Sequence, residues 1–462
     1  MARFAGLARA RAYDRPQMPR VLHLAHHYPP IGGVVGRNLD LSRYLPDFGY
    51  EPTVLTSPAQ GATEWGWAPQ DDQLARRVGD VRVARVHGPV PANATGLRAG
   101  LERRLEISPR RIRWWVSAAV ERTRELDGPF DVILANLLPL ETSFAAATLA
   151  RELGIPWVAD LDDPWAIDEM RVAPTALNYR IDLRKMRRGL GSASAFVMSC
   201  PEAAVRLRRE LPDLADRPID AIAHGFNRDD YAGPRPVRDD GAFRIVHTGS
   251  LHTELGLEHR ASARMRRLLG GTSVDVDIHT RSHVYLLEAI DRLAATEPEL
   301  AGRIEVHLVG NLTPADREVA DRYPCVRTHG HLPHPETVAM ARSADLLFLP
   351  MHELPVGRRA GIVPCKSYEY LAAERPILAA VPDGDLRDLL VKFERVSLVR
   401  PSDVAGMVAA LRDRMLEPER GVGDDGPDGA LLWPYERREM SRRIAAMLDR
   451  VIGVERAAPL AA

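Results

Sequence analysis

The chain has 462 residues, of which 45% are hydrophobic, and its 62 Lys and Arg residues nearly balance 63 Asp and Glu residues. This length exceeds a single ordinary core, so two or three domains are expected. The near-zero net charge argues against nucleic-acid binding, and the lack of an apolar run of roughly 18 residues excludes an integral membrane protein. The three cysteines lie far apart, which argues against a disulfide framework and fits a cytoplasmic protein.

Residues 1–19 are rich in Arg and contain no apolar h-region, so we expect a flexible leader and not a secretory signal. From residue 20 to residue 231, short β-rich runs alternate with helical patterns. The predicted strands are 21–25, 53–56, 81–86, 131–135, 157–160, 195–199 and 219–223, and the predicted helices include 112–126, 141–153 and 201–211. This alternation predicts βαβ units around a parallel sheet, and therefore an N-terminal Rossmann-like domain.

Residues 232–242 are rich in Pro, Gly and charged side chains, which is typical of a linker between domains. A second alternating series follows over residues 243–430. Its predicted strands are 244–247, 304–309, 325–329, 346–349, 377–380 and 396–399, and its predicted helices include 283–294, 315–322, 336–342, 366–373 and 386–391. Two doubly wound α/β domains then form a cleft between them, because such sheets bind ligands at the carboxyl ends of their strands.

The last segment, residues 431–462, contains a helical pattern with Met440, Ile444, Met447, Leu448 and Val451 on one face. An apolar stripe of this kind needs a partner surface. The pattern alone leaves open whether the helix packs on the second domain or crosses back to the first.

The first predicted strand leads into His26, His27 and a turn that contains Gly32 and Gly33. Glycines between a strand and a helix let the backbone approach a ligand, and a helix N-terminus attracts negative charge. The spacing differs from the dinucleotide fingerprint, and a glycine-rich turn without a ligand is the alternative.

Carboxylates follow the predicted strand 157–160, where Asp162 and Asp163 extend a D-x-D triplet that begins at Asp160. Such a triplet can hold a divalent metal under a sugar diphosphate. The chain contains three D-x-D triplets, close to what chance gives, so we favour a carboxylate that hydrogen-bonds a polar acceptor.

Gly249 and Ser250 close the first strand of the second domain, and Arg281 lies just before the predicted helix 283–294. A guanidinium at a helix start can bind an anion in the cleft. A solvated surface charge is the alternative.

The densest group of candidates lies between residues 357 and 376. Arg358, Arg359 and Lys366 surround glycines, Gly361 among them, ahead of a predicted helix, which favours a diphosphate pocket. Glu369 follows Lys366 by about one turn, where a carboxylate can accept both hydroxyls of a ribose. The alternative is an i,i+3 surface ion pair between these two side chains.

Two further patterns have simpler explanations. His329, His331 and His334 invite a zinc site, but we favour loop histidines. Residues 97–124 interleave Arg with Trp114 and Trp115, which fits contact with a membrane or an anionic acceptor. A helix that packs its aromatic residues inward is the favoured alternative.

Six short motifs occur in order along the chain. They are Pro29-Pro30 with Gly32-Gly33, Asp160-Leu161-Asp162-Asp163-Pro164-Trp165, the HGFNRDDY of residues 224–231, the HTGSL of residues 247–251, the PCKSYEYLA of residues 364–372, and Arg375-Pro376-Ile377. With these motifs the chain resembles the retaining glycosyltransferases of family 4 over residues 20–452. The resemblance implies the GT-B fold, with two Rossmann-like domains facing across a cleft and the helix of residues 431–462 returning to the N-terminal domain.

The resemblance also implies roles for the donor-site candidates. Glu369 would bind the ribose of a nucleotide sugar, and Arg281 and Lys366 would neutralise its diphosphate. Gly32 and Gly33 would approach the diphosphate from the other domain. The base would face the loop of Gly330, His331 and Leu332.

The implied reaction is transfer of a sugar from a nucleotide sugar, with retention of configuration, in the assembly of cell-surface polysaccharide or glycolipid. The acceptor would be a sugar or a polyprenyl-linked glycan, and it would meet His26, His27, Asp162 and Asp163. No cofactor or metal is expected. The enzyme would work in the cytoplasm, with peripheral contact at the inner face of the membrane.

The chain departs from the family pattern at two places. Many members carry an E-x7-E pair, and Gly361 stands where its first acid is expected. Residues 252–279 form an insert ahead of Arg281, for which a lid, an interface and an inert elaboration are all open. Both departures motivate an alternative, a degenerate homologue that binds a nucleotide sugar or a partner protein without turnover. A third reading, a non-hydrolysing nucleotide-sugar epimerase, would need further acid and base carboxylates in the cleft.

Overall fold

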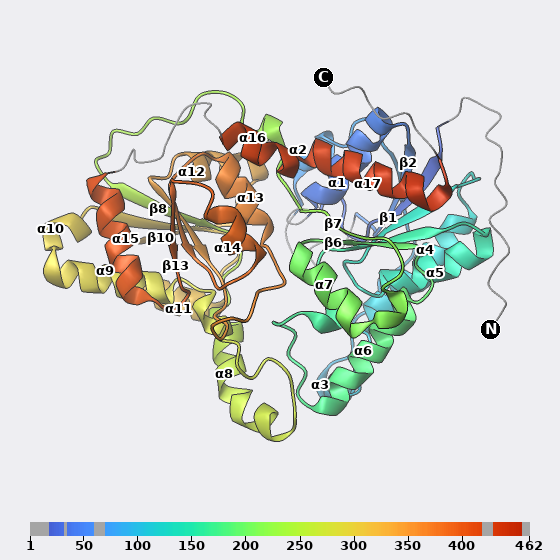
Figure 1. Cartoon of the computed structure of the whole chain (residues 1–462), viewed down its shortest axis with the longest axis horizontal. Helices are drawn as coiled ribbons and strands as arrows, with labels where there is room; N and C mark the ends of the chain where they lie inside the picture. Colours follow the sequence, from blue (N-terminus) through green and yellow to red (C-terminus); the bar gives the residue numbers. More distant parts are fainter. Residues whose placement is uncertain (1–17, 32–34, 60–69, 418–427, 455–462) are drawn as a thin grey trace.

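The computed structural model describes residues 18–31, 35–59, 70–417 and 428–454, except the side chains of Arg103 and Asp428. The chain forms two α/β domains that lie side by side (Figure 1). Residues 1–17 of the predicted leader, and the candidates Gly32 and Gly33, lie outside the described residues. Across the described ranges, no helix combines the length and the apolar character needed to cross a membrane.

The N-terminal domain is built on a seven-stranded sheet in the order β3-β2-β1-β4-β5-β6-β7, and all neighbouring strands are parallel. The strands are β1 (Arg20–Leu24), β2 (Glu51–Thr56), β3 (Arg82–Arg85), β4 (Val132–Asn136), β5 (Trp157–Leu161), β6 (Ala195–Met198) and β7 (Ile219–Ala221). The α-helices are α1 (Gly36–Tyr44), α2 (Asp72–Arg76), α3 (Gly96–Arg104), α4 (Arg110–Arg124), α5 (Thr142–Leu153), α6 (Ala176–Leu190) and α7 (Pro201–Glu210). The central strands are apolar almost without interruption because both faces of a parallel sheet are covered.

The C-terminal domain is built on a six-stranded parallel sheet in the order β10-β9-β8-β11-β12-β13. The strands are β8 (Phe243–Thr248), β9 (Ile304–Val309), β10 (Val326–Gly330), β11 (Leu346–Pro350), β12 (Ile377–Ala380) and β13 (Val396–Val399). The helices are α8 (Thr253–Leu268), α9 (Val284–Thr296), α10 (Pro298–Ala301), α11 (Pro314–Ala320), α12 (His334–Arg342), α13 (Cys365–Ala372), α14 (Asp385–Leu390) and α15 (Val404–Leu416). All the runs predicted as strands in both halves are confirmed.

The chain ends with α16 (Asp428–Leu432) and α17 (Arg437–Ile452), and α17 packs on the N-terminal domain. Met440, Ile444, Met447 and Leu448 are buried in one cluster with side chains of β1, β4, β5 and β6. The sequence left two surfaces open for this apolar stripe. In the structure, the stripe packs on the N-terminal sheet.

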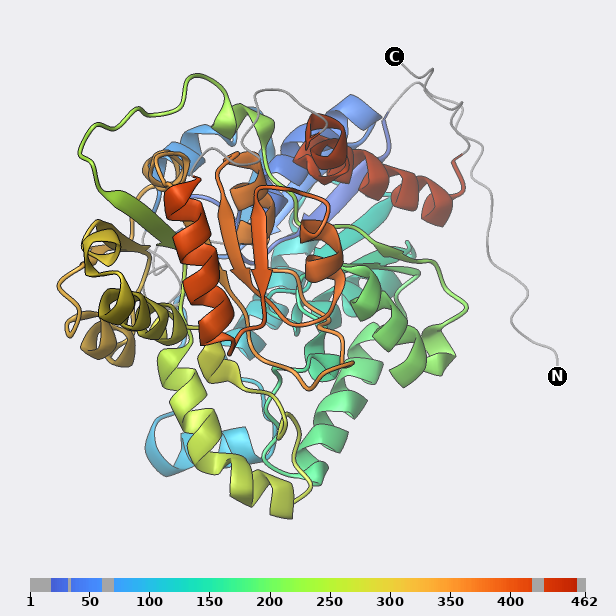
Figure 2. The same cartoon turned by 60° about the vertical axis from the view of Figure 1, so that its left-hand side comes forward.

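The insert of residues 252–279 consists mainly of α8, which extends to the lower end of the molecule, and of a return segment (Figures 1 and 2). In the return segment, the Thr272 N–H donates to Ala173 O at 3.0 Å. At the end of α8, Leu269 O accepts a hydrogen bond from the Ala176 N–H at 3.2 Å. The insert is therefore an interface between the two domains.

Candidate active site

The carboxyl ends of the two sheets meet between the domains. Glu169, which follows β5, accepts a hydrogen bond of 3.1 Å from Nε2 of His352, which follows β11. Asp162 and Asp163 also follow β5, and Gly249 follows β8. Parallel α/β sheets bind ligands at this edge, so we take it as the candidate active site.

Three glycines with positive φ stand side by side at the ends of β8, β9 and β10. Gly249, Gly310 and Gly330 have φ angles of 92°, 137° and 67°. The Gly249 N–H donates to Val309 O and the Gly310 N–H donates to Gly330 O, each at 2.7 Å. A Cβ on Gly310 would lie 2.7 Å from Gly249 O, so a side chain does not fit there. The strand ends thus offer bare backbone to a ligand.

Lys366, in the first turn of α13, lies against this row of glycines. Its Nζ donates to His247 Nε2 at 3.2 Å, because Nδ1 of that ring donates to Phe348 O at 3.0 Å. Burial, and secondly the charge of Arg281, lower the pKa of Lys366 to about 7, although Glu369 acts in the opposite direction. Among the described contacts, Lys366 bonds His247 and not Glu369, so the surface ion pair considered from the sequence is not formed.

Arg281 reaches toward the N-terminal domain from the segment before α9. Its Nη1 lies 3.3 Å from Sδ of Met170. Burial lowers the pKa of this guanidinium, an effect opposed by the carboxylates of Asp163, Asp168 and Glu169. The C-terminal domain thus presents two cations at an edge where the N-terminal domain presents carboxylates.

Glu369 is contacted by an arginine of α17, the helix that packs on the N-terminal domain. Its carboxylate lies 3.6 Å from the guanidinium of Arg437, which also donates to Asp40 Oδ2 at 3.0 Å. Arg437 belongs to α17 and Asp40 belongs to α1. The Glu369 side chain retains 28% exposure, so a ligand can still reach its carboxylate.

A buried arginine lies between the carboxylates of the D-x-D triplet. Arg37 of α1 binds both oxygens of Asp160, at 2.8 and 3.1 Å, and lies 3.5 Å from Asp162 Oδ1. Asp162 also accepts a hydrogen bond of 2.9 Å from Asn136 Nδ2. Burial and the charge of Asp160 raise the pKa of Asp162 to about 7. Because the guanidinium occupies the place of a cation, these residues do not fit the metal site that the triplet suggested.

Residues 32–225 match the model of the Glycosyl transferase 4-like domain family. Among solved structures, sucrose-phosphate synthase from Thermosynechococcus elongatus is 15% identical, with a TM-score of 0.64 over 95% of this chain and 100% of that chain. Anabaena HepE in complex with UDP and glucose is 14% identical, with a TM-score of 0.58 over 94% and 100% of the two chains. Trehalose-6-phosphate synthase is 12% identical, with a TM-score of 0.58 over 94% and 99%. The chain has the GT-B fold. No curated protein sequence matches it.

Within the GT-B fold, His26 and His27 lie beneath the surface of the site. They are only 1% and 5% exposed, and the His26 ring packs edge-on against His27 at 4.5 Å and Trp115 at 4.8 Å. Burial lowers the pKa of both histidines. The sequence analysis placed both at the acceptor; the structure corrects this, because two covered imidazoles do not contact a substrate. Asp163, by contrast, is exposed.

Arg359 is directed at carboxylates of α7 and α14 and not at Lys366. It pairs with Glu202, Asp385 and Asp388 at 2.6 to 3.6 Å. Arg358 is exposed at the wall of a cavity of about 400 Å³ between the domains. The expectation that these two arginines form one diphosphate pocket with Lys366 is therefore corrected.

Gly361, where an acid was expected, is contacted by the opposite domain. Its N–H donates to Glu169 Oε1 at 2.9 Å, and its carbonyl accepts a bond from Cys200 Sγ at 3.1 Å. A Cβ here would lie 2.7 Å from the guanidinium of Arg206, which is paired with Glu169. Burial acts to raise the pKa of Glu169, but His352 and Arg206 hold it below its usual range. The close approach of Arg206 leaves no room for a side chain at position 361. Glu169 of the other domain supplies a carboxylate next to this position.

The remaining donor-site candidates lie along the same edge: Gly249, Ser250 and Gly330 are exposed, and His331 and Leu332 are half-buried. The two histidines that flank that loop contact different partners. His329 Nε2 lies 2.9 Å from His307 Nδ1, whereas His334 Nε2 donates to Asp230 at 2.9 Å. Within the ranges that the structure describes, no three His, Cys, Asp or Glu side chains are arranged to hold a metal ion.

Sequence reasoning missed Arg37, Asn136, Glu169, Arg206 and Arg437. Arg37 had one signal, because it follows the glycine-rich turn at the start of a helix. The others bond partners from distant segments, and no local pattern marks them.

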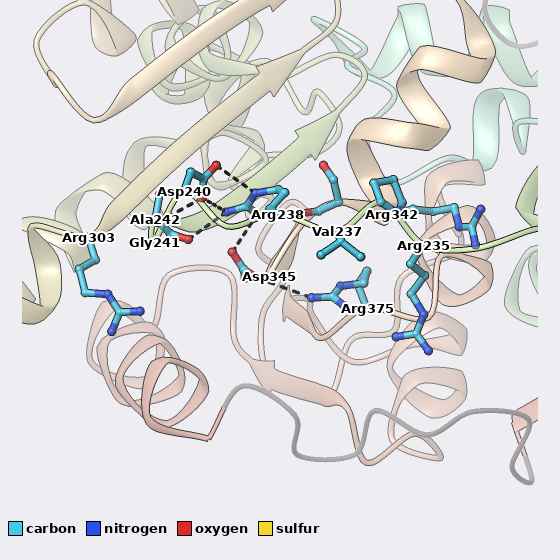
Figure 3. A pocket seen from close by; sticks show the side chains of 12 residues that line it. Arg235, Val237, Arg238, Asp240, Gly241, Ala242, Arg303, Arg342, Asp345 and Arg375 are labelled. Atoms are coloured by element: carbon cyan, nitrogen blue, oxygen red, sulfur yellow. Dashed lines mark hydrogen bonds and ion pairs between the residues drawn. The ribbon is translucent and has the colours of Figure 1, made fainter.

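Another cavity, of about 610 Å³, lies beside the linker (Figure 3). Its charged lining residues are Arg235, Arg238, Arg303, Arg342, Arg375, Asp240 and Asp345. Arg238 pairs with Asp240 at 2.9 Å and with Asp345 at 3.0 Å, and Arg342 donates to the carbonyl of Gly233 at 2.6 Å. This cavity lies at the amino end of β8, away from the GT-B substrate edge, so we exclude it from the site.

Proposed function

We propose that the chain is a glycosyltransferase that moves a sugar from a nucleotide-sugar donor to an acceptor, with retention of configuration and without a metal ion. One observation carries the proposal. Two half-buried cations lie at the carboxyl ends of the strands: Lys366 stands over the strand end at Gly249, and Arg281 faces carboxylates of the other domain. The GT-B fold and the match of residues 32–225 support sugar transfer as the reaction class.

The donor would lie along the C-terminal domain. Its diphosphate would contact Lys366 and Arg281 beside the backbone at Gly249, because cations stabilise phosphate oxygens and a residue without a Cβ lets them come close. Its ribose would bond the accessible carboxylate of Glu369. The base would face the loop of Gly330, His331 and Leu332. Solved neighbours bound to UDP and glucose support a nucleotide sugar as the donor.

The chemistry follows from where charge develops. Breaking the anomeric bond places negative charge on the leaving diphosphate, and cations that are already in position stabilise that charge without reorganisation. Enclosure between two domains excludes water and so limits hydrolysis of the donor. For retention we propose front-face attack by the acceptor hydroxyl, with the leaving phosphate taking its proton. A structural neighbour studied for glycosyl transfer with retention supports this choice.

The acceptor would enter from the N-terminal side, where Asp163 is exposed and Asp162 has a pKa of about 7. We propose a sugar or a polyprenyl-linked glycan, in the assembly of cell-surface polysaccharide or glycolipid, with the enzyme in the cytoplasm at the inner face of the membrane. The degenerate, non-catalytic alternative has one observation in its favour, the absence of an acid side chain at Gly361.

The test is calorimetric titration of the full chain with UDP, GDP, ADP and dTDP in excess EDTA. We expect one nucleotide to bind, and Glu369→Ala to weaken it by about tenfold to a hundredfold, since a hydrogen bond to a charged group contributes roughly 1.5–3 kcal/mol. The matched control is Glu318→Ala, which removes an exposed carboxylate from α11. The melting temperature of Glu369→Ala should stay close to wild type because Arg437 keeps Asp40.

Binding without sugar transfer, measured with the matching nucleotide sugar and a panel of lipid-linked and free acceptors, would favour the degenerate reading. No binding of any nucleotide would overturn the donor site. Reversible loss of turnover on chelation would overturn metal independence.

A further inference from the structure

Three segments from both domains meet at the lower end of the molecule, and we call this surface the tip (Figures 1 and 2). It comprises α3 with residues 105–107, the start of α6, and the end of α8 with Leu269. The Ala176 N–H donates to Leu269 O at 3.2 Å, and Asn178 Nδ2 donates to Arg104 O at 2.7 Å. The first turn of α6 therefore joins the end of α3 to the end of α8.

The tip exposes large apolar side chains. Those between 42% and 97% exposed are Leu97, Leu101, Leu105, Ile107, Leu177, Met265, Leu268 and Leu269. They are eight of the eighteen exposed large apolar side chains in the described ranges. Single exposed apolar residues are normal, but a contiguous group of them marks an interaction surface.

The tip is also strongly basic. Residues 96–107, 176–180 and 264–269, which form the tip, carry seven Arg residues and two Glu residues, in a chain whose formal net charge is −1. The side chains of Arg104, Arg180 and Arg264 are exposed, and none of them has an ion pair among the described residues. Basic side chains without carboxylate partners, around exposed leucines, complement an anionic and apolar surface.

We propose that the tip docks on an anionic lipid bilayer. The leucines enter the interface, and the arginines stay at the level of the headgroup phosphates with their aliphatic stems along the apolar region. Binding is peripheral, through side chains of the tip. Charge complementarity favours this occupant over a second copy of the chain, because two identical basic tips repel each other.

The tip adjoins a cavity between the domains. Beyond Leu269, the Ser273 hydroxyl donates to Glu169 O at 2.6 Å, and Thr272 and Ser273 line the cavity of about 400 Å³ together with Asp168 and Tyr179. A glycan attached to a lipid in the bound bilayer lies near this cavity. This last step rests on the proposed function, whereas lipid binding itself does not.

The test is co-sedimentation of the full chain with vesicles of phosphatidylcholine, alone and with about a third phosphatidylglycerol. We expect binding to the anionic vesicles that weakens with salt. Leu177→Asp with Leu268→Asp should lower the bound fraction about tenfold, since both leucines lose their place in the interface. The matched control is Val391→Asp with Leu416→Asp, two exposed apolar side chains that do not belong to the tip.

The charge contribution is tested by Arg180→Glu with Arg264→Glu, against Arg151→Glu with Arg317→Glu on other helices. Only the first pair should weaken binding. Equal binding by tip and control variants, or no vesicle binding by wild type, overturns the proposal. Self-association of wild type that the tip variants abolish, measured by light scattering without lipid, would assign the tip to a second copy instead. Nucleotide titration of the tip variants tests the donor site independently. A failure of lipid binding and a failure of the donor site are thus distinguishable.

Discussion

At the scale of single residues, the site combines two cations of different kinds. Arg281 faces carboxylates, whereas Lys366 is half-buried against His247 and has a pKa of about 7. A lysine in this setting gains its proton when a diphosphate supplies the missing negative charge. The nucleotide and the proton should therefore bind together.

We expect nucleoside diphosphate binding at pH 8 to take up close to one proton. The binding enthalpy, measured in buffers with different ionisation enthalpies, should vary with the buffer in wild type. Lys366→Arg keeps the charge but is already protonated, so its enthalpy should not depend on the buffer. A wild-type enthalpy that is the same in all buffers would contradict the assignment of Lys366 to the diphosphate.

Asp162 is a second residue whose environment opposes its charge. Its folded-state pKa of about 7 lies above the unfolded value of 3.8, so the folded chain holds a proton that the unfolded chain releases between these values. Stability should therefore fall as the pH rises from about 4 to about 7.

We expect Asp162→Asn to raise the free energy of unfolding by roughly 1–3 kcal/mol at pH 8 and to change it little at pH 4. Denaturant unfolding at the two pH values measures this difference. Asp239→Asn in the linker is the control, since that carboxylate is exposed. The same gain at both pH values would show that the carboxylate is not protonated in the folded chain.

At the scale of elements, the insert ties the domains together through backbone contacts. Its return segment runs so close to residues 173 and 174 that a Cβ on Gly271 would lie 2.5 Å from Ala173 O and 2.7 Å from Pro174 O. Those two atoms are backbone, so neither can turn away. The position therefore requires glycine for space and not for a positive φ.

We expect Gly271→Ala to separate the return segment from the N-terminal domain. Hydrogen exchange should quicken at the amides of Thr272 and Ala176, which bond across this interface, and the free energy of unfolding should fall by about 1–3 kcal/mol. Gly100→Ala in α3 has nothing within 4 Å and should leave exchange at both amides unchanged. Unchanged exchange in Gly271→Ala would mean that the insert does not hold the domains.

At the scale of the whole molecule, the domains are joined at the site by the hydrogen bonds of a buried carboxylate. Glu169 of the N-terminal domain binds Arg206 within its own domain, and His352 and the Gly361 N–H of the other domain. Arg206 in turn donates to Arg359 O at 2.6 Å. Removal of one member leaves the others buried without a counter-charge, which is costly.

We expect Glu169→Ala to open the domains as well as to destabilise the chain, by about 3–5 kcal/mol for a broken buried pair. Small-angle scattering should give a larger radius of gyration than wild type. Asp213→Ala, which breaks an exposed ion pair with Arg187 within the N-terminal domain, should leave the scattering profile unchanged. A destabilised Glu169→Ala protein with a wild-type profile would assign this contact to folding and not to closure.

The sequence by itself determined the two α/β domains, their strands, the apolar face of α17 and the candidates at the strand ends. These features are local: strand and helix periodicity, and the position of a residue just after a strand, are written in neighbouring residues. Lys366, Glu369 and Arg281 were chosen as candidates in this way. The helices α6 and α8 were missed because charged residues interrupt their apolar positions.

Only the tertiary structure decided which side chains pair and which are covered. Arg37 meets Asp160 across 123 positions of sequence, and Arg437 meets Asp40 across 397. Lys366 bonds His247 and not Glu369, and His26 and His27, which follow β1, are buried beneath the site. The packing of distant segments sets the partners and the solvent exposure of a charged group, and these two quantities control its pKa and its reach toward a ligand.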